Sequence, residues 1–366
     1  MDIILTYDPR WDYIPEGHST YWESLDTVDY VTELLRKTGN TVLPIVTDDA
    51  FQSRLTETIG QHPGALVFWL NEFVPTDPGA TPLVGRPFIV SVLENLGLMH
   101  TGPGSAALAI GLDKEATKDV FRKLGLLTPE SYVVPPGDFS PIYEHGQWHC
   151  PIIIKPLLHG GSIGIDESSV VPDDDFDAIR ERAERIHHEL GEPALVERYI
   201  GGENAREFSV PVLLSNDGRV GELPIIELDL SHSALAHGEF RYLAYSSKRK
   251  EGFLKMPAAL PPDITKRLYA EAGTICREMG CRDMVRIDLR HDATGYYYIE
   301  VNVNPGKDRL HCYLPASAHS VGLDHDSLIA LIPYQAMLRY GLTPPRELTE
   351  LVQPVMALFD ASQATS

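Results

Sequence analysis

The sequence MVRIDLRHDATGYYYIEVNVNPG at residues 284–306 carries the strongest indication of how this chain folds. Apolar and polar residues alternate along two arms, and the turn-like segment 291–295 lies between them. Successive side chains of a strand point to opposite faces, so each arm has one apolar face and one polar face. The pattern therefore predicts an antiparallel β-hairpin. Its polar face would bring four side chains together: Arg286, Asp288, Glu300 and Asn302.

Two carboxylates and an amide oxygen that meet at one point, beside a guanidinium, form a set of hard oxygen ligands. Mg²⁺ commonly takes one or two such carboxylates together with the phosphates of a substrate. The alternative is an ordinary hairpin whose polar face is solvated. The motifs found elsewhere in the chain favour the metal site.

The chain has 366 residues, which indicates two or three domains, since a domain usually has ~100–200 residues. Its 31 basic and 52 acidic residues give a net charge of −21. This charge argues against a nucleic-acid partner, which would require a basic surface. Anionic ligands must therefore meet local clusters of positive charge, because the overall field repels them.

The N-terminal residues are apolar only briefly and lack the basic segment of a secretory signal, so they predict a first strand. No apolar run approaches the ~18 residues that suggest a membrane span. We therefore expect a cytoplasmic protein without a membrane partner. The four cysteines lack the spacing of a zinc site or a disulfide framework and are expected to be free thiols.

Residues 1–98 alternate between strand-like and helix-like runs, which is typical of a parallel sheet covered by helices. The strand-like runs are residues 2–7, 41–46 and 65–70, and an amphipathic stretch at 22–37 separates the first two. Further helices are expected where apolar residues recur at helical spacing: 113–124, 177–190, 262–279 and 326–339. The chain is therefore assigned to the α/β class.

A glycine-rich segment, HGGSIG at residues 159–164, follows an apolar strand that ends in Lys155. Such a turn lets backbone N–H groups approach an anion, and an adjacent lysine adds positive charge. The segment lacks the Gly-Lys-Ser/Thr ending of the Walker motif, and a plain loop explains it equally well. Lys114 and Lys248 are further candidates for anion binding, but sequence spacing does not show that the three lysines converge.

These motifs, taken in order, resemble the ATP-grasp superfamily and most closely its D-alanine–D-alanine ligase branch. The resemblance is close over residues 90–316 and loose over the N-terminal domain. Six motifs carry it: LDK at 112–114 with Lys118, IKP at 154–156 before the glycine-rich loop, ERYI at 197–200, REFSV at 206–210, RID at 286–288, and EVN at 300–302 with PG at 305–306.

The resemblance implies an ATP-grasp fold preceded by an N-terminal Rossmann-like domain. The expected domains are residues 1–98, a central lid at 99–190, and a C-terminal unit at 191–366 that carries the metal site and a mobile loop. The implied reaction joins a carboxylate to an amine through an acyl phosphate, with ATP as the phosphoryl donor. The substrates would be small, amino-acid-like molecules, and the resemblance implies a homodimer.

The resemblance also assigns roles to individual residues. ATP would be bound by Lys114, Lys155, Ser162, Glu197, Arg198, Tyr199, Ile200, Glu207 and Lys248. Glu207 would hold the ribose hydroxyls, and Lys248 would close over the phosphates as a catalytic residue of the mobile loop. Two Mg²⁺ ions, or Mn²⁺ in their place, would be bound by Asp288, Glu300 and Asn302. Arg286 and the backbone N–H of Gly306 would stabilise a tetrahedral intermediate.

Members of this branch hold their first substrate and the closed loop with a Glu, a Ser and a Tyr, and all three are altered here. Trp22 stands where the Glu is expected, with Glu23 one residue away. Gly161 replaces the Ser, and Arg249 replaces the Tyr. Three altered partners together suggest a different substrate at the amino-acid sites.

The segment KDRLHC at 307–312 departs as well, because it replaces a small, Ser-containing segment that holds the acceptor carboxylate. We expect Lys307 and Arg309 to bind a carboxylate there, with solvent-facing charge as the alternative. The candidate substrate residues are Trp22, Glu23, His159, Gly161, Arg249, Lys307 and Arg309.

From these departures we expect an amide-forming ligase for amino-acid-type substrates outside housekeeping D-alanyl-D-alanine synthesis. A genuine D-alanine–D-alanine ligase, and a cyclase or ester-forming ligase of a specialised metabolite, remain alternatives. A regulatory ATP-binding protein is disfavoured, because it would not need the Arg286 guanidinium at the site of oxyanion formation. A metal hydrolase is disfavoured too, because the neighbours His187 and His188 lack the spacing of helical zinc ligands.

Overall fold

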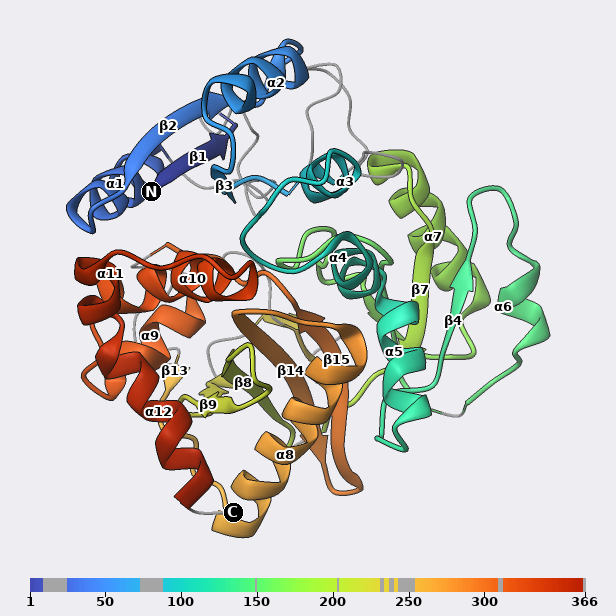
Figure 1. Cartoon of the computed structure of the whole chain (residues 1–366). Helices are drawn as coiled ribbons and strands as arrows, with labels where there is room; N and C mark the ends of the chain where they lie inside the picture. Colours follow the sequence, from blue (N-terminus) through green and yellow to red (C-terminus); the bar gives the residue numbers. More distant parts are fainter. Residues whose placement is uncertain are drawn as a thin grey trace.

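The computed structural model describes residues 1–8, 25–72, 88–148, 150–202, 204–230, 234–236, 240–242, 254–308 and 312–364. Three of its sheets organise the chain into successive units (Figure 1). The first is parallel and lies near the N-terminus, and the other two are antiparallel. The mixed helix and sheet composition confirms the predicted α/β class.

The N-terminal unit is a three-stranded parallel sheet with the order β2-β1-β3. Its strands are β1 (Asp2–Tyr7), β2 (Thr41–Val46) and β3 (Leu66–Trp69), which confirms the three predicted strands. Helices α1 (Leu25–Lys37) and α2 (Phe51–Gln61) make the crossovers that parallel strands require. Helix α1 is the described part of the predicted amphipathic stretch.

The central unit is a four-stranded antiparallel sheet with the order β4-β7-β5-β6. Its strands are β4 (Ser131–Val134), β5 (Ile152–Pro156), β6 (Val170–Val171) and β7 (Ala194–Arg198), and its helices are α6 (Ser140–Glu144) and α7 (Phe176–Leu190). Helix α7 confirms the predicted helix and ends at Gly191, whose φ of +67° favours glycine. Because β7 pairs between β4 and β5, this unit extends beyond residue 190, where the sequence placed its end.

The C-terminal unit is built on an antiparallel sheet with the order β13-β10-β8-β14-β15, and β9 pairs with β8. Its strands are β8 (Arg206–Leu214), β9 (Val220–Glu222), β10 (Ile226–Leu228), β13 (Leu254–Lys255), β14 (Met284–Asp292) and β15 (Gly295–Asn302). Strands β11 (Ala234–Ala236) and β12 (Phe240–Tyr242) form a separate pair. Helix α8 (Pro262–Met279) confirms the helix predicted there, and its Leu268 and Ile275 pack with Val285 and Ile287 of β14.

Three helices connect the N-terminal sheet to the central one: α3 (Ile89–Asn95), α4 (Ser105–Leu112) and α5 (Lys114–Lys123). As predicted, the Asp113 carboxylate caps α5 and accepts the backbone N–H groups of Glu115 and Ala116 at 2.9 and 3.0 Å. Phe121 of α5 packs 5.3 Å from the Tyr298 ring of β15. Helix α5 therefore packs against the C-terminal sheet, whereas the sequence placed it in the central domain.

Four helices close the C-terminal unit: α9 (Tyr313–Ser320), α10 (His325–Arg339), α11 (Arg346–Leu351) and α12 (Gln353–Ala364). Helix α10 confirms the helix predicted at 326–339. These helices cover one face of the N-terminal sheet, since Leu5 and Phe68 share a buried cluster with Leu331 and Phe359.

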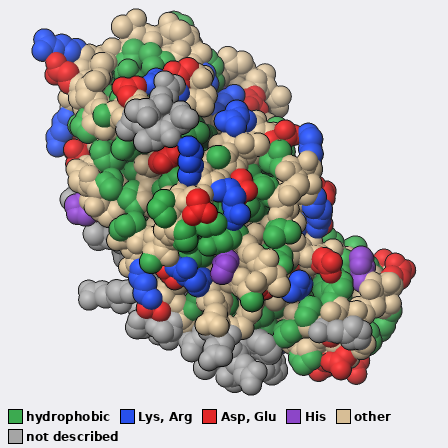
Figure 2. All heavy atoms as spheres, turned by 90° about the horizontal axis from the view of Figure 1, so that it is seen from below, with side chains coloured by type: hydrophobic (Ala, Val, Ile, Leu, Met, Phe, Trp, Pro, Cys, Tyr) green, Lys and Arg blue, Asp and Glu red, His purple; other side chains and the backbone are tan. Residues whose placement is uncertain are grey.

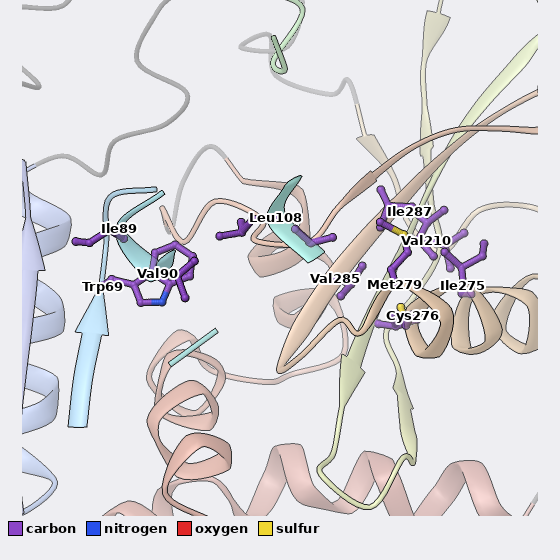
Figure 3. Close-up of a cluster of buried hydrophobic side chains, with 14 of the residues drawn as sticks. Trp69, Ile89, Val90, Leu108, Val210, Ile275, Cys276, Met279, Val285 and Ile287 are labelled. Carbon is purple, nitrogen blue, oxygen red and sulfur yellow. The ribbon is translucent and has the colours of Figure 1, made fainter. Parts of the chain in front are cut away.

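The other face of the N-terminal sheet belongs to a second buried cluster that reaches the C-terminal sheet (Figure 3). Trp69 and Ile89 lie at one end of this cluster, Val285 and Ile287 lie at the other, and Leu108 lies between them. The central unit has a buried cluster of its own. The N- and C-terminal units are thus joined by continuous cores, and the central unit packs separately.

Acidic and basic side chains are interspersed among apolar ones on the face shown in Figure 2. The negative charge of the chain therefore does not form one continuous acidic patch on this face. Within the described part of the chain, no helix is both long enough and apolar enough to cross a membrane.

Candidate active site

The predicted hairpin is present as the pair β14 and β15. The two strands run antiparallel, with Arg286 opposite Asn302 and Asp288 opposite Glu300. The register shifts between Asp288 and Leu289, and the chain turns between Asp292 and Gly295. The alternation of apolar and polar residues therefore predicted both the element and the face that its polar side chains share.

The Asp288 carboxylate is the centre of the hydrogen bonds on this face. Arg286 donates to both of its oxygens at 3.0 Å, Asn302 Nδ2 donates at 3.0 Å, and Ser209 Oγ donates at 2.5 Å. Burial opposes the charge of Arg286, but the neighbouring carboxylate outweighs it and raises the pKa of the guanidinium. The same guanidinium lies 4.9 Å from the centre of the Tyr313 ring.

The donor atoms of the hairpin fit a hard divalent cation. Asp288 and Glu300 stand opposite each other in the two strands and contribute carboxylates, and Asn302 contributes an amide. Mg²⁺ accepts this combination and completes its shell with water or phosphate oxygens. No cluster of three or more His, Cys, Asp or Glu side chains placed for a metal occurs among the described residues. A cation at this hairpin would therefore complete its shell with water or with oxygens of a bound substrate, and substrate phosphates are the ligands that the sequence predicts.

A buried carboxylate on the central sheet holds two lysines. Glu197, at the end of β7, lies 2.5 Å from Lys155 Nζ on β5 and 2.8 Å from Lys118 Nζ on α5. Burial alone would raise the pKa of Glu197, but the two ammonium groups outweigh it and lower the pKa to about 2. Glu197 therefore stays ionised and fixes Lys155 at the pocket.

Lys114 lies in the first turn of α5 and binds the backbone where the glycine-rich loop begins. Its buried Nζ donates to the backbone oxygens of Pro156 at 3.1 Å and Leu157 at 3.2 Å, and also to that of His159. Burial lowers the pKa of this ammonium, although the Glu300 carboxylate opposes the shift. The role of Lys114 in binding phosphate remains a prediction, and its contacts give it a second role in shaping the loop.

Glu192 is a second buried charge that anchors the glycine-rich loop. It is fully buried, its Oε1 lies 2.9 Å from His159 Nδ1, and its Oε2 accepts the backbone N–H of Leu158 at 3.2 Å. Farther along the loop, a side chain at position 164 would be too close to Pro156, because a Cβ at Gly164 would lie 2.6 Å from Pro156 Cγ. The φ of Gly164, +68°, also favours glycine. The conformation of the loop is thus determined by buried residues far away in the sequence and by the backbone conformation of its own glycine.

A pocket opens between the central and C-terminal sheets. It brings together most of the residues singled out from the sequence: Lys114, Lys155, His159, Gly161, Ser162, Glu197, Arg198, Tyr199, Ile200, Glu207, Asp288 and Glu300. Arg286 and Asn302 reach it through their hydrogen bonds to Asp288. Lys155 of the central unit and Lys114 of α5 thus line one cavity together with the carboxylates of the hairpin.

Lys307 lies apart from this pocket, in a small crevice beside Trp69. It is buried, and its Nζ donates to Asn304 Oδ1 at 3.0 Å. The Asn304 amide donates in turn to Glu72 of the N-terminal unit at 2.9 Å. The solvent-facing alternative for Lys307 is therefore wrong, because the side chain sits at the boundary between two units.

Gly306 lies close to Cys312, since a Cβ at this glycine would be 2.6 Å from Cys312 Sγ. The remaining candidates lie outside the described residues: Trp22, Glu23, Lys248, Arg249 and Arg309.

Sequence reasoning assigned no individual role to three residues at this site. Lys118 has a detectable signal, because it follows Lys114 by one helical turn and shares its face of α5. Arg290, which lines the pocket, follows Asp288 by two residues and shares its strand face. Glu192 has no comparable signal, since its contacts with the loop depend on the fold alone.

A family model described as D-ala D-ala ligase C-terminus matches residues 139–332. A D-alanine–D-alanine ligase of Chromohalobacter salexigens is 32% identical over 66% of this chain and 70% of its own. One from Alcanivorax borkumensis is 31% identical over 69% and 73%. The crystal structure of D-alanine–D-alanine ligase from Bacillus anthracis complexed with ATP superposes with a TM-score of 0.64 at 20% identity, covering 93% of this chain and 98% of that one. The predicted ATP-grasp fold is confirmed.

Proposed function

Because the chain belongs to the D-alanine–D-alanine ligase family and is an ADP-forming ATP-grasp ligase that makes carbon–nitrogen bonds, we propose that it joins two molecules of D-alanine. The names of its relatives favour D-alanine over the specialised substrates that its altered residues suggest. The proposal therefore adopts the housekeeping alternative in place of the substrate expected from the sequence.

The observation that carries this proposal is the pocket that Lys114, Lys155, Asp288 and Glu300 share. A triphosphate needs positive charge along its length and oxygen ligands for the cation that accompanies it. The hairpin offers those oxygens, and helix α5 and the central unit offer the lysines. Mg²⁺, when bound by Asp288, Glu300 and Asn302, would neutralise phosphate charge during transfer.

The reaction that fits this site has two steps. A carboxylate oxygen of the first D-alanine attacks the γ-phosphorus of ATP, the bond to the bridging oxygen breaks, and ADP leaves. The amine of the second D-alanine then attacks the acyl carbon, loses a proton and expels phosphate. Each step places negative charge near the hairpin, where buried groups can stabilise it.

Arg286 is proposed to stabilise the oxyanion of the second step. Its two hydrogen bonds to Asp288 and its position on the Tyr313 ring restrict the guanidinium to one orientation. A donor that is oriented before the reaction needs no rearrangement as charge develops. The backbone N–H of Gly306 is proposed as the second donor.

The second candidate is a ligase for a different pair of amino acids. Its supporting observation is Lys307, a buried cation beside Trp69 in the segment that should hold the acceptor. Gly161 also lines the pocket where the family has a serine. A larger or more acidic acceptor would make use of both differences.

The test is phosphate release from ATP and Mg²⁺ with D-alanine alone, L-alanine alone, and pairs of D- and L-amino acids. Product masses are recorded in the same samples. Release with D-alanine alone and a product of two D-alanines less one water would support the proposal. A condensed product from another pair would favour the second candidate, and release without a condensed product would contradict both.

A further inference from the structure

Arg290 is a pocket residue without a role in the function proposed above. It lies on β14 two residues beyond Asp288, and strand alternation points it to the same face. Its side chain is 12% exposed and lines the pocket. In the β8–β14 register, Arg290 stands directly opposite Glu207. A charged residue buried at this point calls for an account beyond the metal site.

The guanidinium of Arg290 contacts two other pocket residues. Its Nε lies 3.2 Å from Glu207 Oε2, and its carbon lies 5.0 Å from the centre of the Tyr199 ring. Burial opposes the charge of Arg290, but Glu207 and Tyr199 outweigh it and raise the pKa of the guanidinium. Because Tyr199 follows β7, Arg290 joins the central unit to the two strands β8 and β14.

The neighbouring Arg206 does not share this role. It makes a bidentate pair with Glu227 of β10, with both distances at 2.8 Å, and packs over the Phe208 ring. Arg206 precedes Glu207 on β8, so its side chain points to the opposite face of the sheet. Two arginine–glutamate pairs thus lie on this sheet among the described residues, and the pair of Arg290 and Glu207 lines the pocket.

A carboxylate that binds the hydroxyls of a sugar must present its oxygens in a fixed direction. A flexible glutamate at the pocket wall would lose side-chain entropy on binding, and this loss weakens affinity. An arginine across the strand pair restricts the glutamate before the ligand arrives. The Tyr199 ring beneath the guanidinium in turn restricts the arginine.

We propose that Arg290 is a positioning residue that orients Glu207 toward the ribose of the nucleotide and so determines the preference for ribose over deoxyribose. The inference rests on ATP as the nucleotide of the proposed function. It predicts that Arg290 acts on nucleotide binding and leaves the chemical steps unchanged.

The test compares Arg290→Met with Arg206→Met, which removes the matched pair on the other face. Binding of ATP, 2′-deoxy-ATP and 3′-deoxy-ATP is measured by calorimetry in the presence of Mg²⁺, and unfolding temperatures are recorded. We expect Arg290→Met to weaken ATP binding ~10-fold or more, because Glu207 then loses the buried ion pair that holds it. Binding of at least one deoxynucleotide should change much less. Arg206→Met should leave all three affinities within about twofold of wild type.

Three further variants separate positioning from folding. Glu207→Gln should lose the same ribose preference, and adding Arg290→Met to it should have little further effect on that preference. Arg290→Lys keeps the charge but loses the planar guanidinium, so its ribose preference should lie between those of wild type and Arg290→Met. This variant also serves if Arg290→Met does not fold.

Equal weakening of all three nucleotides, or an unchanged ribose preference in both Arg290 variants, would overturn the inference. Because binding is measured without amino acids, this result is independent of turnover. Failure to release phosphate with any amino acid would instead count against the proposed function.

Discussion

The hairpin β14–β15 and the glycine-rich loop at 159–164 face the same pocket but are built in different ways. The hairpin places Asp288 opposite Glu300 by backbone register. The loop is held by Lys114 and Glu192, which lie some distance away in sequence and are both buried. Substitutions in the hairpin should therefore change chemistry with little effect on folding. Substitutions of the loop anchors should change the shape of the loop and its stability.

The largest effect is expected for Glu300→Gln. A metal contributes several kcal/mol to stabilisation of transferred phosphoryl charge, so weakening its site should lower kcat about 10³-fold or more. The unfolding temperature should change little, because strand register is preserved. Steady-state kinetics measures the expected loss of kcat, and calorimetry measures the unfolding temperature. Near-normal turnover would remove Glu300 from the proposed metal site.

Arg286→Lys is expected to come next. Lysine keeps the charge but cannot reproduce the two hydrogen bonds to Asp288, so the oxyanion donor loses its orientation. Loss of one oriented donor typically lowers kcat about 10²–10³-fold. The KM for ATP should remain close to that of wild type. A rise in this KM at constant kcat would instead make Arg286 a binding residue.

Glu192→Gln should act on folding before it acts on catalysis. The amide of glutamine cannot reproduce both hydrogen bonds of the buried carboxylate, and a buried polar group left without its partner commonly costs about 1–3 kcal/mol in the free energy of unfolding. The exposed Glu184 of α7, which pairs with Arg180 at 3.1 Å, provides the control. Glu184→Gln should cost less than about 1 kcal/mol. Equal costs in urea denaturation would show that Glu192 does not anchor the loop.

The smallest effect concerns acid stability through Glu197. Its pKa is lowered to about 2 in the folded protein, so the unfolded chain binds this proton more readily. The resulting stabilisation is fully present above the ordinary glutamate pKa and is lost as the pH falls through about 2. We expect a contribution of up to about 3 kcal/mol in this window.

The control for this prediction is Glu197→Gln, measured by urea unfolding between pH 5 and 2. The variant should be less stable than wild type at pH 5, and the difference should shrink toward pH 2. A constant difference across this range would contradict the charge pairing with Lys118 and Lys155.

The difference between the two regions also explains what the sequence could predict. Strand periodicity is local, so the hairpin and its four polar residues could be found before the fold was known. The same rule extended by two residues would have found Arg290. The contact between Glu192 and His159 spans 33 positions and leaves no periodic trace. Buried charges of this kind can be identified only once the fold is known.

Domain limits and substrate were harder to predict for related reasons. Strand β7 joins the central sheet, and helix α5 packs on the C-terminal one, through pairings that local patterns do not encode. The altered residues Gly161 and Lys307 suggested a specialised substrate, whereas the relatives favour D-alanine. A replaced residue shows that one contact differs from that of the family, but the choice of substrate depends on all the contacts of the site.

The most direct test of the ligase assignment follows the oxygen atoms of the first substrate. D-Alanine labelled with ¹⁸O in its carboxylate is incubated with ATP, Mg²⁺ and the protein, and the released phosphate is analysed by mass spectrometry. Formation of an acyl phosphate predicts one ¹⁸O in each phosphate, because the carboxylate oxygen that attacks phosphorus stays with it. Unlabelled phosphate, released at the same rate with or without D-alanine, would mean that the protein hydrolyses ATP and would contradict the ligase mechanism with this substrate.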